Sequence, residues 1–160
     1  MSSWNVIEKE VLLALLPHRE NMLLLSRIVD YDLDGHTIRT EYDITRDCLF
    51  HDPALDGIPA WIGFECMAQS AAVITGLENR KPGLGLILSV SCMEIQQPLL
   101  RAGSTVSITV TEDVKMDSVY TYIAEMSLED NPVAKAKLTV YTTRDESAFA
   151  DTIAVNNGPR

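Results

Sequence analysis

One segment constrains the fold more than any other, because residues 59–75 are apolar along almost their whole length. Proline suits the first turn of a helix, since its missing N–H needs no partner there. Gly76 is typical of a helix C-terminal end. We therefore predict one long helix over Pro59–Thr75, spanning about 25 Å at about 1.5 Å per residue. A helix that is apolar on nearly all sides must be wrapped by other structure.

Within this helix the polar residues are few: Glu65, Gln69, Ser70 and Thr75. Glu65 and Gln69 are four residues apart and share a face. An ionised carboxylate is costly in apolar surroundings unless it is paired or its pKa shifts. His51 lies in the loop before the helix, and a histidine beside a carboxylate is suited to moving protons at neutral pH. We take His51 and Glu65 as candidate catalytic residues; a buried, hydrogen-bonded acid that holds the loop is the alternative for Glu65.

Most of the remaining chain alternates between short β-branched or apolar runs and turn signals, which is typical of strands. Apolar residues at helical spacing predict a short amphipathic helix over residues 6–16, which Pro17 ends. From residue 144 onward the chain is small, polar and patternless, so we expect residues 144–160 to form a flexible tail. The predicted strands are residues 22–30, 36–44, 86–96, 105–115, 119–128 and 133–142.

This order of elements predicts the fold class. A single domain over residues 1–143 is long enough to bury a core. One apolar helix and a run of antiparallel strands bury both of their apolar faces when a curved sheet wraps the helix. We therefore predict an α+β hot-dog fold, with a long central helix wrapped by an antiparallel sheet of about six strands.

Composition excludes several functions. The net charge of −10 argues against binding nucleic acid or anionic membranes. No run approaches the ~20 apolar residues that a membrane span needs, and the N-terminus does not resemble a secretory signal. The three cysteines are widely spaced and form neither a CxxC nor a metal pattern, which favours the reducing cytoplasm.

Two segments resemble the hot-dog 3-hydroxyacyl-(acyl carrier protein) dehydratases of fatty-acid and polyene synthesis. Residues 17–27, PHRENMLLLSR, are similar to that family's PHRxPFLLVDR opening. The segment from His51-x-Pro53 through Pro59 to Glu65-Cys-Met-Ala-Gln69 is similar to its HFP…PG…EAMAQ block, with the same fourteen-residue step from histidine to acid. The resemblance covers about residues 10–142, and its wording is most similar to the dehydratases of aryl-polyene gene clusters.

The resemblance implies a mechanism without metal or other cofactor. His51 takes the α-proton of a 3-hydroxyacyl thioester, and Glu65 protonates the departing hydroxyl to give a trans-2-enoyl thioester and water. The family shares this site across a dimer, so Glu65 of one chain faces His51 of the other. Backbone N–H groups of Ala60 and Trp61, at the positive end of the helix dipole, are expected to stabilise the enolate-like oxygen.

Other residues take roles that the resemblance suggests. The substrate is carried on the phosphopantetheine of acyl carrier protein, an acidic partner that basic residues attract.

His18 is expected to be structural, and His36 to be exposed after a glycine turn. The remaining expectations are a substrate tunnel lined by Trp61, Met22 and Phe64, support from Gln69, Pro53 and Pro59, and carrier-protein contacts at Arg19, Arg80, Lys81 and Arg101.

Some positions depart from the family pattern, and other functions stay open. Asp52 stands where the family has phenylalanine, and we expect this carboxylate to raise the pKa of His51. Ala60 stands where the family has glycine. A hot-dog thioesterase is one alternative function, although it has no use for His51 at this spacing. A stabilising subunit paired with a second hot-dog protein is another, so both a homodimer and a heterodimer are possible.

Overall fold

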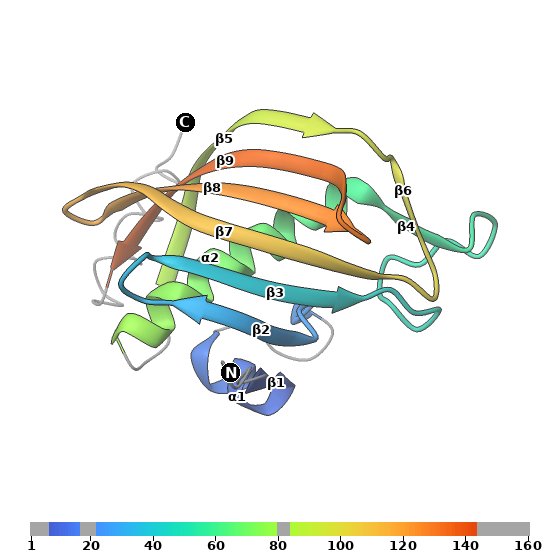
Figure 1. Cartoon of the computed structure of the whole chain (residues 1–160), viewed down its shortest axis with the longest axis horizontal. Helices are drawn as coiled ribbons and strands as arrows, with labels where there is room; N and C mark the ends of the chain where they lie inside the picture. The colour runs from blue at the N-terminus through green and yellow to red at the C-terminus, as the bar shows by residue number, and fades with distance from the viewer. Residues whose placement is uncertain (1–6, 17–21, 80–83, 144–160) are drawn as a thin grey trace, which may run out of the picture.

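A computed structural model describes residues 7–16, 22–79 and 84–143. A seven-stranded antiparallel sheet curves around helix α2 (Gly63–Asn79) (Figure 1). Its strands follow the order β1 (Ile7–Glu8), β2 (Arg27–Asp32), β3 (Thr37–Asp43), β7 (Thr105–Met116), β8 (Val119–Leu128), β9 (Asn131–Thr143) and β5 (Leu84–Ile95). The smaller elements are α1 (Lys9–Leu15), the 3-10 helix η2 (Ala60–Ile62), and the paired strands β4 (Gly57–Pro59) and β6 (Leu99–Arg101). The predicted α+β fold is confirmed.

Strands β7, β8 and β9 form because β-branched and aromatic residues alternate between the core and the surface. Val106, Ile108 and Val110 are fully buried along β7. Two-residue turns join these strands, and each turn contains an aspartate in the left-handed conformation, with φ of 52° at Asp117 and 64° at Asp130. Short polar side chains tolerate this conformation, which matches the twist of a hairpin.

Helix α2 buries most of its surface against the sheet, as its apolar sequence predicts. Ser70 is fully buried, and its hydroxyl lies 2.7 Å from Oγ1 of Thr40 on β3. Cys66 belongs to the core, where burial raises the pKa of its thiol. The helix is therefore fixed against the sheet by packing and by buried polar pairs, Ser70 with Thr40 on β3 and Thr75 with Tyr122 on β8.

The predicted ends of the long helix are wrong in two ways. The first turn is the 3-10 helix η2, and α2 continues past Gly76 to Asn79. Gly76 does not end the helix; it allows close contact with α1. A Cβ at this position would lie 2.8 Å from the carbonyl oxygen of Leu15, closer than atoms pack. The glycine therefore serves packing between the two helices.

The N-terminal elements also differ from the prediction. The first helix begins at Lys9, after the two-residue strand β1. Strand β2 begins at Arg27, not at Met22, because the leucines before it are buried against α2 and the N–H of Leu24 bonds to a helix side chain. Pro17, His18 and the predicted tail at residues 144–160 lie outside the described residues, so the domain boundary stays a prediction.

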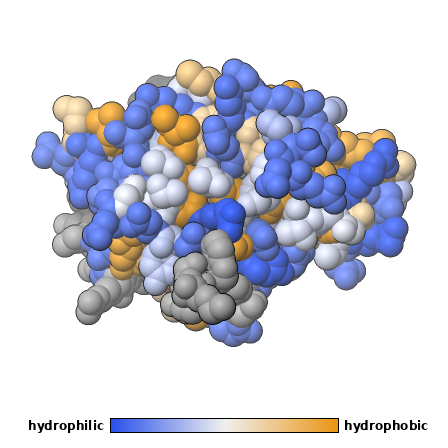
Figure 2. Space-filling model, viewed as in Figure 1, coloured by the Kyte–Doolittle hydropathy of each residue, from blue (hydrophilic) through white to orange (hydrophobic). Residues whose placement is uncertain are grey.

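The surface is mostly hydrophilic on the face shown in Figure 2, with hydrophobic residues in separate groups. In the described part of the chain, no helix is both long enough and apolar enough to cross a bilayer. Strand β5 ends the strand order and exposes large apolar side chains: Ile87, Leu88, Met93 and Ile95.

Candidate active site

His51 sits in a tightly bonded loop between β3 and β4. Its backbone N–H donates to the carbonyl of Cys48 at 3.0 Å, and the N–H of Asp52 donates to the carbonyl of Gly57 at 2.8 Å. The imidazole is only 9% exposed, and its Nε2 lies 3.2 Å from Oδ1 of Asp56. The loop therefore presents one histidine in a fixed orientation beside a carboxylate.

Asp56 is the carboxylate that contacts His51, and the sequence reasoning missed it. Arg46 binds Asp56 through two nitrogens, at 2.9 and 2.7 Å, and this guanidinium holds the pKa of the Asp56 carboxyl below its usual value. Asp52, which we expected to act on His51, instead accepts a hydrogen bond from the N–H of Ala54 at 2.8 Å. This bond closes a local turn, a common role for aspartate.

Gln69 holds Glu65 in place, as the four-residue spacing predicts. The Gln69 amide is fully buried, and its Nε2 donates to Oε1 of Glu65 at 3.1 Å and to the carbonyl of Met22 at 2.7 Å. Its Oε1 accepts the N–H of Leu24 at 3.0 Å. One side chain thus orients the acid and ties α2 to the segment before β2.

Glu65 lies on the wall of a cavity of about 340 Å³ between α2 and the strands β5, β8 and β9. The helix side of the cavity is made of small residues, Ala68, Ala71 and Ala72, which leave the space open. The remaining described lining residues are Thr75, Gly85, Leu86, Ile87, Tyr122, Val140 and Thr142. Its size and largely apolar wall, with a few polar groups, are typical of a small-molecule site.

The predicted tunnel residues do not line this cavity. Trp61 is 58% exposed and Met22 is 49% exposed, while Phe64 packs against the core. Their role in a tunnel stays a prediction. Of the predicted supporting prolines, Pro53 is exposed and Pro59 directly precedes η2.

The expected oxyanion donor Ala60 is wrong. Its N–H donates to the carbonyl of Pro98 at 2.9 Å, which ties the start of η2 to the strand pair β4–β6, and the residue is fully buried. An amide that is already paired in this way cannot also bind a thioester oxygen. Trp61 follows it in the first turn, where helical N–H groups lack an intrahelical acceptor.

The structure does not bring all predicted residues together. His51 is not among the described residues that line the cavity beside Glu65. Arg101, on β6, is exposed and available for a partner. Arg19, Arg80 and Lys81 lie outside the described residues, so the carrier-protein contacts stay a prediction.

Comparisons with known proteins place the chain among dehydratases. The family described as ApeP-like, ApeP dehydratase, matches residues 11–151. The 3-hydroxyacyl-[acyl-carrier-protein] dehydratase FabZ of Chlamydia abortus is 30% identical over 137 residues, covering 82% of this chain and 79% of that protein. FabZ of Chlamydia pneumoniae is 29% identical over 114 residues, covering 68% and 74%.

Solved structures share the fold. The dehydratase heterocomplex ApeI:P from Xenorhabdus doucetiae aligns with a TM-score of 0.80 at 21% identity, covering 89% of this chain and 96% of that one. A thioesterase-like protein from Ralstonia eutropha aligns with a TM-score of 0.59 at 17% identity, covering 71% and 82%. At these identities the likeness concerns the fold alone.

Proposed function

Because the chain belongs to the ApeP-like dehydratase family, we propose that it removes water from a 3-hydroxyacyl chain held on the phosphopantetheine of acyl carrier protein. The product is a trans-2-enoyl thioester. One observation carries the proposal: a glutamate, oriented by a buried glutamine, on the wall of an apolar cavity. The cavity takes the acyl chain, and the acid meets its 3-hydroxyl.

The proposed reaction needs one base and one acid. His51 takes the proton from C2, the C–H electrons form the C2–C3 double bond, and the C3–O bond breaks. Glu65 gives its proton to the departing hydroxyl, which leaves as water. Arg46 keeps the Asp56 carboxylate ionised, and this carboxylate favours the His51 tautomer that carries its proton on Nε2. Nδ1, the other ring nitrogen, is therefore the proposed base. The Trp61 N–H is the proposed donor to the thioester oxygen.

We further propose that the site is completed by a second hot-dog chain. The cavity borders β5, which ends the strand order and carries exposed apolar residues. An open, apolar sheet edge is a surface for pairing with another chain. A partner that pairs there supplies its histidine loop to Glu65.

The three cysteines are free, which fits a reducing cytoplasm.

A heterodimer is the second form of this proposal, and the fold of a dehydratase heterocomplex supports it. In a mixed dimer the two shared sites differ, and this chain then contributes one competent site or serves as a stabilising subunit. Size-exclusion chromatography with mass detection separates the two forms. A chain that dimerises alone supports the homodimer, and one that dimerises only with a second hot-dog protein supports the mixed pair.

The direct test is mass spectrometry of 3-hydroxyacyl-carrier protein incubated with the purified chain, alone and with its co-purified partner. We expect loss of one water, which His51→Ala and Glu65→Gln abolish. Release of the free acid would show a thioesterase instead. No reaction in either preparation would overturn the proposal.

Mixing the two inactive variants tests whether the site is shared. If His51 and Glu65 act from different chains of a homodimer, random exchange gives half mixed dimers with one intact site each, so about a quarter of the wild-type activity returns. Recovery is absent if each chain holds its own pair.

Narrowing the cavity tests its role. Ala72→Leu places a branched side chain in the space beside the acyl group, so we expect a selective loss of activity on the longest accepted substrates. An exposed helix residue, Lys9→Leu on α1, is the control. Equal loss on all chain lengths in the Ala72 variant would argue against the cavity as the acyl site.

A further inference from the structure

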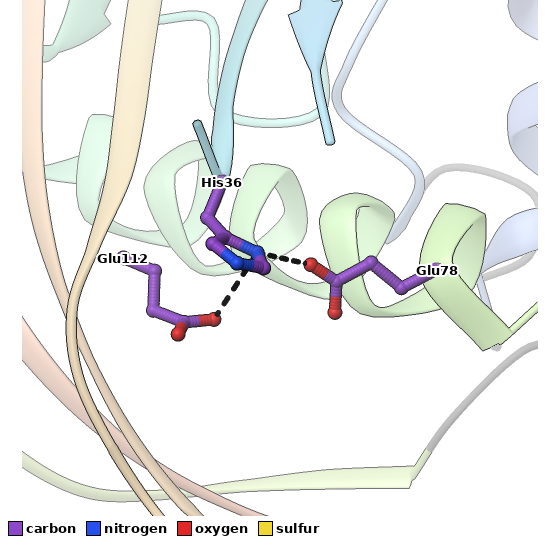
Figure 3. A group of neighbouring side chains, drawn as sticks. All are labelled: His36, Glu78 and Glu112. Carbon is purple, nitrogen blue, oxygen red and sulfur yellow. Dashed lines mark hydrogen bonds and ion pairs between the residues drawn. The ribbon is translucent and has the colours of Figure 1, made fainter. Parts of the chain in front are cut away.

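Three side chains from separate elements meet at the far end of α2 (Figure 3). His36 comes from the turn between β2 and β3, Glu78 from the last turn of α2, and Glu112 from β7. Nδ1 of His36 lies 2.6 Å from Oε1 of Glu78 and 3.9 Å from Oε2 of Glu112. One nitrogen or oxygen atom of each residue lies within 4.8 Å of the others. The expectation that His36 is exposed is thus only partly correct, because its ring also binds Glu78.

Glu112 shows that this cluster lacks a partner. Its side chain is only 10% exposed, and its Oε2 atom accepts no hydrogen bond from any residue that the structure describes. Figure 3 shows this oxygen turned toward the imidazole. A buried carboxylate oxygen without a donor is costly, and natural proteins rarely leave one unexplained.

We propose that His36, Glu78 and Glu112 bind a divalent transition-metal ion of the zinc class. An imidazole nitrogen and two carboxylate oxygens are ligands that such ions accept at about 2.0–2.2 Å. Ligand atoms around one ion then stand roughly 3 Å apart, so the observed separations need only small side-chain shifts. Water completes the coordination, since His36 is 45% exposed.

Charge balance supports a cation at this place. Two carboxylates face one imidazole, and Nδ1 of His36 hydrogen-bonds Glu78, not Glu112. Among the described residues, the other cation near the cluster is Lys115, whose charge acts on both carboxylates from a distance while its Nζ lies 5.0 Å from the ring centroid of Tyr120. A divalent ion would bind both acids at once and supply the buried Glu112 oxygen with a partner.

The proposed ion is structural. Glu78 is thirteen residues after Glu65 on the same helix, a separation of about 20 Å along its axis. The ion therefore lies far from the acid of the active site. It would join the end of α2 to β7 and to the β2–β3 turn, three elements that the sequence separates widely.

The test uses the full-length, tag-free protein after chelator treatment, titrated with zinc chloride by calorimetry and followed by thermal melting. We expect one zinc per chain and a raised Tm. His36→Asn and Glu112→Gln should each weaken zinc binding by about tenfold or more. Asparagine suits the variant, because His36 has φ of 50° and asparagine tolerates that conformation. Magnesium, which prefers oxygen ligands, should bind far more weakly.

Two control variants separate this site from adventitious binding. Asp34→Asn removes an exposed acid from the same turn, and Cys92→Ser removes an exposed thiol, so neither should change zinc affinity. Three results would overturn the proposal. They are no zinc binding up to about 1 mM, unchanged zinc affinity in His36→Asn and Glu112→Gln, and loss of zinc binding in Cys92→Ser.

Discussion

At the scale of single residues, Gln69 links the fold to the proposed chemistry. Its buried amide makes three hydrogen bonds, to Glu65, to the Met22 carbonyl and from the Leu24 N–H. A glutamine four residues after the acid was visible in the sequence. Its partners in the segment before β2 were not, because that segment was predicted as a strand.

Replacing Gln69 should therefore affect stability and activity together. Gln69→Leu keeps the volume but leaves the Leu24 N–H and the Met22 carbonyl without partners, so we expect a loss of about 1–3 kcal/mol in the free energy of unfolding. Urea unfolding measures this loss, and kcat should fall because Glu65 is no longer oriented. Gln96→Leu, an exposed glutamine after β5, should leave both unchanged. Equal effects in the two variants would contradict this role.

A second residue-scale feature sets a pH dependence. Arg27 binds Asp43 and Glu41 on β3, and its hydrogen bond to Asp43 holds the pKa of that carboxyl below its ordinary value. A carboxyl with a lowered folded-state pKa stabilises the fold above its unfolded pKa of about 3.9, and this stability is lost as pH falls through the folded value.

Asp43→Asn should accordingly lower the free energy of unfolding at pH 7, and this difference should shrink as pH falls below about 3.9 toward pH 2. Because Asp43 is 37% exposed, solvent screening limits the effect to about 1 kcal/mol or less. Urea midpoints across this pH range test it, with the exposed Asp47→Asn as the control. A constant difference at all pH values would rule out the ionic origin.

At the scale of elements, Gly76 governs how α1 packs on α2. Alanine favours a helix by up to about 1 kcal/mol over glycine. At Gly76, however, its Cβ would meet the Leu15 backbone, whereas at Gly63 it would meet the flexible end of Met126. We expect Gly76→Ala to lower Tm and Gly63→Ala to lower it less. A Tm that rises in the Gly76 variant would contradict the packing role.

The same elements show what the sequence could predict. Strands β7, β8 and β9 are long, and their side chains alternate between core and surface, so the sequence pattern predicts each of these strands. Strands β4 and β6 have three residues each, too few for a pattern. The pairing of the Ala60 N–H with Pro98, and the meeting of His36 with Glu78, depend on tertiary contacts between residues far apart in sequence. Such contacts cannot be predicted from the residues next to each partner in the sequence.

At the scale of the whole molecule, β5 forms one edge of the described sheet, where we propose that a second chain pairs. This strand has twelve residues, and its apolar side chains are exposed in the single chain. Long, apolar edges promote pairing with another chain. Because β5 also lines the cavity beside Glu65, the proposed pairing would couple assembly to the proposed active site.

A charge on this edge should separate the chains. In Leu88→Lys, two lysines meet across a symmetric edge, or one enters an apolar contact in a mixed pair, so we expect weaker dimerisation and reduced activity. Met116→Lys, on the β7–β8 hairpin and 70% exposed, is the matched control. Analytical ultracentrifugation measures the dimer dissociation constant. A dimer that survives Leu88→Lys unchanged would place the interface elsewhere.

The alanines on α2 have a consequence for how such enzymes diversify. Because Ala68, Ala71 and Ala72 line the helix side of the cavity, a larger side chain at any of them would take up space beside Glu65. One codon change there can shorten the pocket while the strands that hold the fold together stay as they are.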